Sequence, residues 1–265
     1  LLVYGSSFAH ELTDAKGFGW QISGVQHDWS SLISAKDIEI DRLEGIYRNL
    51  LKNSGVNLIS GAAKLAGPHE ILVNDKTISA KRILIAVGGM PTILDIPGMA
   101  ENAITSNEAL DLNELPETIV IHGGGYIALE FAGIFAALGS KTHLIYRSNF
   151  PLRGFDENVR EHIAECLVDR GVILHPQTSI TKVEAESGKQ TIWLNTQETI
   201  IADQILSATG RKPNTHSLGL DEVGIKTGPV GQIIVSEDAQ TSVPSIYAIG
   251  DATDRVNLTP VAIGE

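Results

Sequence analysis

The sequence predicts an α/β fold built from two Rossmann-like units. Residues 118–139 show a buried strand, a glycine loop and a helix in succession, which is the opening of a βαβ unit. In addition, a pattern of short alternating strands that ends in a buried apolar strand and a glycine occurs twice, over residues 55–88 and 171–210. The strand, loop and helix precede the second copy, and their counterpart for the first copy would lie before Leu1.

The glycine loop has a specific pattern. The strand predicted over residues 118–122 runs directly into Gly123-Gly124-Gly125-Tyr126-Ile127-Ala128, the GxGxxA form of a dinucleotide-binding loop. Gly123 permits a tight turn, Gly125 lets the backbone approach a pyrophosphate, and Ala128 lets the helix pack closely on the strand. Free N–H groups at the start of the helix attract phosphate. A glycine-rich turn without a ligand is the alternative.

Spacing predicts the helix after this loop and the strand that follows it. Four apolar residues recur at helical spacing, namely Ile127, Phe131, Phe135 and Leu138. Gly139 is well placed to end the helix, and residues 141–146 then give the second strand.

The residues after this second strand indicate which dinucleotide binds. An NAD-binding unit usually has Asp or Glu there, which accepts hydrogen bonds from the ribose hydroxyls. This chain has Arg147, and Arg153 follows six residues later. Guanidinium groups bind a 2′-phosphate through charge-assisted hydrogen bonds, so the pair favours NADPH over NADH. The alternative is two ordinary surface arginines. Similarly, Tyr126 and Glu130 lie either near the nucleotide or serve as a packing aromatic and a surface carboxylate.

A second motif covers residues 241–251, TSVPSIYAIGD. Residues 246–249 form a predicted buried strand, Gly250 allows close backbone approach, and Asp251 lies at the strand's carboxyl end, where open α/β sheets bind ligands. Asp251 could accept hydrogen bonds from a polyol such as the ribityl chain of a flavin. An Asp after Gly is equally typical of an ordinary turn.

Together these motifs carry a family resemblance. GGGYIALEFAG (123–133), ATGRKPNT (208–215), AIGDATDRVNLTPVAIGE (248–265) and the arginine pair resemble the flavoprotein pyridine nucleotide–disulfide oxidoreductases. GFGW (17–20) and RLEGIY (42–47) point to the branch that reduces glutathione disulfide. The resemblance implies two domains of the three-layer ββα type, with an NADPH domain over 89–211 inserted between FAD-binding parts over 1–88 and 212–265.

The resemblance also implies roles for single residues. The expected NADPH contacts are Gly123, Gly124, Gly125, Ile127, Glu130, Arg147, Arg153, Gly210 and Asn257. The expected FAD contacts are Ala63, Gly88, Gly250, Asp251 and Thr259. Tyr126 matches an aromatic residue that covers the flavin and moves aside for nicotinamide, and Glu130 matches a carboxylate near the nicotinamide amide, so both are candidate catalytic residues. Ile46 and Tyr47 match residues at the disulfide-substrate site.

Some features of the family have no counterpart in these residues. Ala86-Val87-Gly88 stands where the family usually has Ala-Thr-Gly. The family's reactive cysteine pair and the lysine after it would lie just before Leu1, and its catalytic histidine and dimerisation domain after Glu265. Cys166 matches none of them and is predicted to pack within a helix over 157–169. We therefore expect an internal piece of a longer protein, one that does not turn over by itself.

Composition narrows the classes of function. Twenty Lys and Arg against 32 Asp and Glu leave a formal charge of −12, which disfavours a nucleic-acid-binding surface. No apolar run approaches the roughly 20 residues that span a bilayer. A single cysteine excludes an internal disulfide, a thiolate zinc cluster and a CxxC pair among these residues, and no metal is expected.

The sequence thus predicts a homodimeric FAD enzyme that uses NADPH to reduce glutathione disulfide, with a cytoplasmic location as the simplest expectation. Trypanothione reductase is the nearest alternative. Dihydrolipoamide dehydrogenase is disfavoured, since it would have an acidic residue in place of Arg147. A flavoprotein that passes hydride from flavin to a quinone or iron–sulfur partner without redox cysteines, and a module that only binds nucleotide, remain alternatives.

Overall fold

The computed structural model describes residues 1–265. The chain divides into two compact units. Unit 1 holds residues 1–50 and 92–210, and unit 2 holds residues 51–91 and 211–265. The α/β class predicted from the sequence is confirmed.

Unit 1 is built around a parallel sheet of five strands in the order β6-β13-β7-β8-β9. These strands are β6 (Ala103–Ile104), β7 (Thr118–His122), β8 (Lys141–Ile145), β9 (Ile173–His175) and β13 (Gln204–Ser207). An antiparallel meander consists of β10 (Ile180–Glu186), β11 (Lys189–Leu194) and β12 (Thr199–Ala202). The helices are α1 (Leu2–Asp14), α2 (Trp29–Asn53, which continues into unit 2), α3 (Met99–Asn102), α4 (Ser106–Ala109), α5 (Tyr126–Ala137) and α6 (Glu157–Asp169), with a short 3₁₀ turn η1 (Ala15–Phe18).

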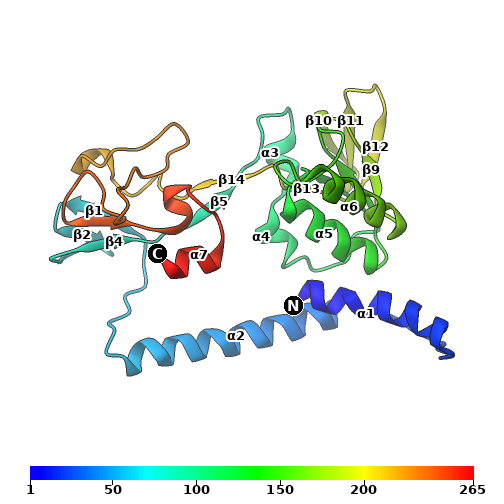
Figure 1. The fold of residues 1–265 in the computed structure, drawn as a ribbon, viewed down its shortest axis with the longest axis horizontal. Helices are drawn as coiled ribbons and strands as arrows, with labels where there is room; N and C mark the ends of the chain where they lie inside the picture. The colour runs from blue at the N-terminus through cyan, green and yellow to red at the C-terminus, as the bar shows by residue number, and fades with distance from the viewer. The chain divides into compact units, whose positions relative to one another are not determined.

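Alternation along β7 explains the three layers of unit 1 (Figure 1). Successive side chains of a strand point to opposite faces of its sheet. Ile119 and Ile121 belong to a core cluster with α5 and α6, whereas Val120 belongs to a cluster with the meander. The parallel sheet is therefore buried between helices and meander, which is the ββα arrangement expected from the sequence.

Helix α5 packs as its apolar spacing predicts. Phe131 and Phe135 are buried, Leu138 is at the edge of the core, and Gly139 ends the helix with φ +106°. Helix α1 contacts α5, and Leu2 and Trp29 enter the same core cluster. Trp29 stacks on Phe135 with ring centroids 6.0 Å apart, and its Nε1 donates to the carbonyl of Leu112 over 2.7 Å.

Unit 2 contains a meander, two further strand pairs and short helices. The meander is β1 (Ala63–Gly67), β2 (Glu70–Val73) and β3 (Lys76–Ser79). Strand β4 (Ile83–Ile85) pairs in parallel with β15 (Ile246–Ala248), and β5 (Gly89–Pro91) pairs antiparallel with β14 (Arg211–Pro213). The helical segments are η2 (Asp221–Val223), η3 (Gly250–Thr253) and α7 (Thr259–Gly264).

The predicted internal repeat is confirmed. In unit 2, the meander β1-β2-β3 precedes the buried strand β4, and in unit 1 the meander β10-β11-β12 precedes the buried strand β13. In both copies the last strand pairs in parallel with a strand from elsewhere in its unit.

The limits of the two units differ in one respect from the domain limits expected from the sequence. The chain passes between units at 91/92 and 210/211, where the sequence places 88/89 and 211/212. Residues 1–50, however, group with unit 1 rather than with residues 51–91. The contacts of α1 and Trp29 with α5 account for this grouping.

Candidate functional site

The glycine loop lies between β7 and α5, at the carboxyl edge of the parallel sheet. Gly123 has φ +143°, and a Cβ there would overlap the carbonyl oxygen of Ala208, so glycine is required. A Cβ on Gly124 would lie 3.1 Å from the Cβ of Tyr146. Around Gly125 there is open space, as expected where a ligand approaches the backbone. The loop is therefore held from beneath and open above.

The first turn of α5 offers its N–H groups to a ligand. Gly125 is the N-cap residue, and no side chain caps the helix. An uncapped helix N-terminus beside an open glycine is a favourable position for a pyrophosphate. This geometry fits the dinucleotide predicted from the GxGxxA pattern.

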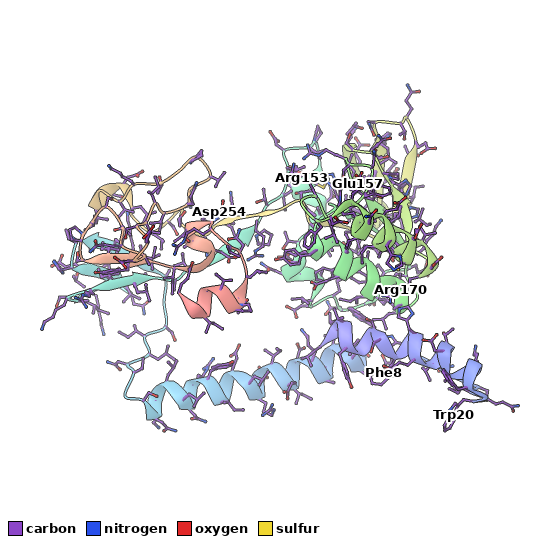
Figure 2. All side chains as sticks on the ribbon, viewed as in Figure 1. Phe8, Trp20, Arg153, Glu157, Arg170 and Asp254 are labelled. Atoms are coloured by element: carbon purple, nitrogen blue, oxygen red, sulfur yellow. The ribbon has the colours of Figure 1, made fainter.

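Arg147 directly follows β8, and Arg153 lies in the segment between β8 and α6. Both side chains are exposed, and neither guanidinium forms an ion pair or a side-chain hydrogen bond. Arg153 lies at the surface of the unit near Glu157, the first residue of α6 (Figure 2). Both arginines are thus free to bind an anionic group.

The segment that carries the two arginines is tied to the glycine loop. The N–H of Leu152 donates to the carbonyl of Gly124 over 2.6 Å. Arg160, on α6, donates from Nε to the carbonyl of Pro151 and from Nη2 to that of Phe150, each over 2.7 Å. Sequence reasoning missed Arg160, because its partners are backbone carbonyls that no sequence motif marks.

Other predicted NADPH residues surround the same loop. Ile127 is half-buried, Glu130 is exposed, and the Tyr126 side chain is 50% exposed at the start of α5. Gly210 follows the Ala208 carbonyl that contacts Gly123 by two residues, and its own carbonyl accepts from the N–H of Thr92 over 2.9 Å. Asn257 belongs to unit 2, so its place in the NADPH site stays a prediction.

His122 lies beneath the glycine loop as the last residue of β7. Its side chain is 4% exposed, forms no hydrogen bond, and leaves Nδ1 buried without a partner. Burial, with a smaller contribution from the positive charge of Arg147, lowers the pKa of His122 to about 4. His122 is therefore neutral near pH 7 and adds no charge to the site.

In unit 2, the parallel pairing of β4 and β15 brings two predicted FAD residues to one sheet edge. Gly88 follows β4 with φ +66°, and Gly250 follows β15 with φ +65°. Asp251 lies over Gly89, where a Cβ would come within 3.1 Å of its Oδ2, so the backbone beneath the carboxylate has no room for a side chain. The partly exposed Asp251 carboxylate can accept hydrogen bonds from a polyol, which fits the flavin ribityl prediction.

Arg211 is a second residue that sequence reasoning missed. Its Nε lies 3.9 Å from Asp251 Oδ2, and its Nη2 donates to the carbonyl of Gly89 over 2.5 Å. The predicted ATGRKPNT segment contains Arg211, but only the pairing of β14 with β5 places it beside Asp251.

The remaining predicted residues are less constrained. Ala63 begins β1 and is exposed, and Thr259 begins α7, which packs on Gly250 through Ala262. Ile46 and Tyr47 lie on α2 with exposed side chains. Their roles stay predictions.

Cys166 lies on α6, the helix predicted for it, and is partly buried. Its Sγ is 3.6 Å from Nε2 of His162. No group of three or more His, Cys, Asp or Glu residues could hold a metal ion.

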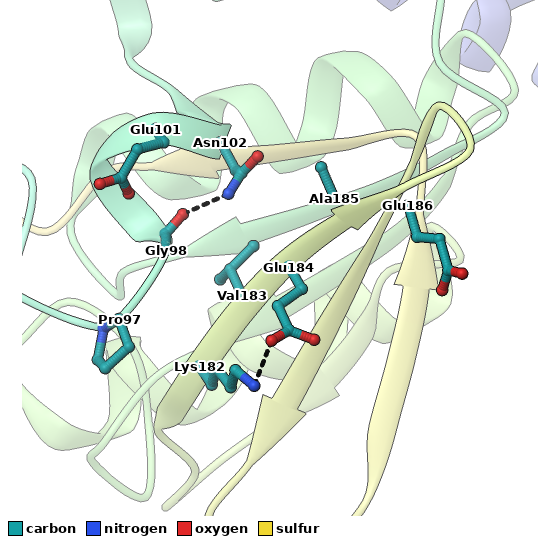
Figure 3. Close-up of a pocket in the computed structure, with 9 residues that line it drawn as sticks. All are labelled: Pro97, Gly98, Glu101, Asn102, Lys182, Val183, Glu184, Ala185 and Glu186. Atoms are coloured by element: carbon teal, nitrogen blue, oxygen red, sulfur yellow. Dashed lines mark hydrogen bonds and ion pairs between the residues drawn. The ribbon is translucent and has the colours of Figure 1, made fainter.

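Two cavities lie away from the glycine loop. The larger, about 550 Å³, lies between α3 and β10 and contains the Lys182–Glu184 ion pair and the hydrogen bond from Asn102 Nδ2 to the Gly98 carbonyl, over 2.7 Å (Figure 3). The other, about 340 Å³, lies in unit 2 between the segments around Lys64 and Thr215. No predicted site residue lines either cavity.

None of the helices is long and apolar enough to cross a membrane.

Comparison with known proteins agrees with these motifs. Residues 5–265 match the family model described as pyridine nucleotide-disulphide oxidoreductase. The chain is 52% identical to the chloroplastic/mitochondrial glutathione reductase of Pisum sativum, aligning all of its own length and 48% of that protein. It is 44% identical to the glutathione reductase of Burkholderia cepacia, aligning all of its length and 59% of that protein.

Among solved structures, it resembles the HOCl-induced flavoprotein disulfide reductase RclA from Escherichia coli, with a TM-score of 0.88 and 25% identity over 99% of this chain and 57% of that one. The chain thus spans about half to three-fifths of the length of the relatives it matches. The family match, which covers nearly every residue, agrees with the glycine loop, the arginine pair and the repeated meanders. The chain belongs to the pyridine nucleotide-disulphide oxidoreductase family.

Proposed function

We propose that the protein to which this chain belongs is an NADPH-dependent flavoprotein disulfide reductase that reduces glutathione disulfide to glutathione. One observation carries the choice of cofactor. Arg147 and Arg153 are exposed, form no ion pair, and are tied through Leu152 to the glycine loop at the start of α5. A guanidinium pair in this position matches the 2′-phosphate that distinguishes NADPH from NADH.

The chain's own residues bind and orient the two cofactors. The first N–H groups of α5 hold the NADPH pyrophosphate, and the two arginines hold its 2′-phosphate. Asp251 accepts hydrogen bonds from the FAD ribityl chain, and Arg211 holds that carboxylate in place. When bound, NADPH supplies a hydride and FAD passes the electrons on to a disulfide.

Other residues have roles that follow from the family. Tyr126, half-exposed at the start of α5, covers the flavin until nicotinamide enters, and Glu130 faces the nicotinamide amide one turn later. Ile127, Gly210 and Asn257 complete the NADPH contacts. Ala63, Gly88, Gly250 and Thr259 complete those to FAD, and Ile46 and Tyr47 line the substrate site.

The first test concerns NADPH. Arg147→Ala combined with Arg153→Ala should weaken NADPH binding about 30-fold or more and change NADH binding less than twofold, because two charge-assisted contacts to the phosphate are lost. Arg170→Ala, at an exposed position near the end of α6, is the control for removal of surface charge. Equal losses for NADPH and NADH would refute the assignment of the two arginines.

The second test concerns the substrate. Turnover by the full-length protein with NADPH should be fastest with glutathione disulfide, compared with trypanothione disulfide and lipoamide. The names of the pea and Burkholderia relatives support this choice. Faster turnover of trypanothione disulfide would assign the protein to the trypanothione branch. Absence of turnover with all three would leave a nucleotide-binding module.

The assembly and location belong to the same proposal. The intact protein forms a homodimer, which sedimentation at micromolar concentration tests directly. It works in a reducing compartment, the cytoplasm or an organelle of the kind named for the pea relative. Fluorescent tagging of the full-length protein distinguishes these locations.

A further inference from the structure

The segment between β8 and α6 is anchored at few points. The hydroxyl of Ser148 donates to the carbonyl of Phe150 over 2.6 Å, and the N–H of Leu152 donates to Gly124. Leu152 and Gly154 adopt positive φ, +53° and +99°, so the chain turns sharply around Arg153. Because turns of this kind have few hydrogen bonds of their own, their shape depends on anchors from outside.

Arg160 supplies two such anchors. Its guanidinium donates to the carbonyls of Phe150 and Pro151, at 2.7 Å each, from a helix that is itself fixed. Asp156 caps that helix by accepting from the N–H of Asn158 over 3.0 Å, and Leu167 packs in the core cluster of unit 1. Arg160 thus connects a rigid element to the peptide groups just before Arg153.

Arg160 also differs in kind from the two arginines it supports. Arg147 and Arg153 are exposed and form no hydrogen bond, whereas Arg160 is half-buried and uses Nε and Nη2 on carbonyl groups. A guanidinium directed at backbone carbonyls in this way orients the segment rather than presenting its charge to solvent.

We propose that Arg160 is a positioning residue for cofactor specificity, which holds the 147–153 segment in the shape that presents Arg147 and Arg153 to a 2′-phosphate. This inference rests on the proposed function, because it assigns the segment to NADPH. Without Arg160 the two arginines remain, but each must be ordered when the nucleotide binds. Ordering two long side chains and their turn weakens binding by about tenfold.

The test uses the 265-residue chain and its Arg160→Met variant, in which a side chain of similar length lacks all donors. NADPH and NADH affinities are measured by nucleotide fluorescence. We expect NADPH binding to weaken about tenfold and NADH binding to change less than twofold. Arg160→Lys, which keeps one donor and the charge, should recover part of the loss, and Arg170→Met on the same helix should have no effect.

Hydrogen exchange separates positioning from direct contact with the phosphate. In the nucleotide-free Arg160→Met variant, the Leu152 amide should exchange faster, while peptides from β7 and the core of α5 keep their rates. Unchanged exchange at Leu152, or equal weakening of NADPH and NADH, would overturn the inference. If the unaltered chain bound neither NADPH nor NADH, the proposed function itself would fail.

Discussion

The buried, unpartnered histidine beneath the glycine loop makes the stability of unit 1 depend on pH. The pKa of His122 falls from 6.5 to about 4 on folding, because burial disfavours the imidazolium form. Between these values the unfolded chain binds a proton that the folded chain does not. Stability is therefore complete above about pH 6.5 and is lost as the pH falls toward 4.

The magnitude follows from the two pKa values. At pH 5, the difference in proton binding lowers the free energy of unfolding by about 2 kcal/mol relative to pH 7.5. His143 adds to the loss, since burial lowers its pKa to about 4 as well, and it lies 2.9 Å from His175 between Nδ1 and Nε2. His122→Val should remove about 2 kcal/mol of this acid sensitivity, because valine fits a buried strand and takes up no proton.

Urea unfolding followed by tryptophan fluorescence is the assay. All three tryptophans, Trp20, Trp29 and Trp193, belong to unit 1, so the signal reports on that unit. His162→Gln, at a side chain that is 73% exposed, is the control for removal of a histidine. The reasoning is refuted if His122→Val loses as much stability between pH 7.5 and 5 as the unaltered chain does.

Three further substitutions test the packing of the two units. Gly123→Ala should destabilise unit 1 by at least about 2 kcal/mol and abolish NADPH binding, because the new Cβ overlaps the Ala208 carbonyl; thermal unfolding and nucleotide fluorescence measure both. Phe135→Ala, at a side chain with 0% exposure, should cost about 3 to 5 kcal/mol in urea unfolding. Arg211→Gln should weaken FAD retention by the full-length protein about fivefold in flavin fluorescence, whereas Lys64→Gln, which breaks the Lys64–Glu222 pair in the same unit, should not.

Local patterns in the sequence were sufficient to predict several elements. Strand β7 covers the predicted residues 118–122, and α6 covers the predicted 157–169. Both have clear limits: the glycine loop follows β7, and Asp156 caps α6. The repeated meander was also predictable, because alternation and turn residues are properties of neighbouring residues.

Long-range contacts were not predictable in the same way. Arg160 and Arg211 were missed because their partners include backbone carbonyls, and every residue type offers the same carbonyl. The grouping of residues 1–50 with unit 1 depends on the contact of α1 with α5, and exposed apolar residues such as Phe8 and Trp20 show that the amphipathic pattern of this segment only partly specifies its packing.

Gly123 shows how two sequence patterns that were interpreted separately depend on each other. The GxGxxA pattern explains why the loop turns tightly, but the structure shows what makes an alanine impossible at its first position. The obstacle is the carbonyl of Ala208, one residue past β13, the strand that closes the second repeat. Because β13 pairs in parallel with β7, with Ser207 opposite His122, the end of the repeat comes to lie beneath the loop. The phosphate-binding geometry therefore depends on correct pairing between strands about 85 residues apart, and a GxGxxA loop without that partner strand would lack the constraint that shapes it.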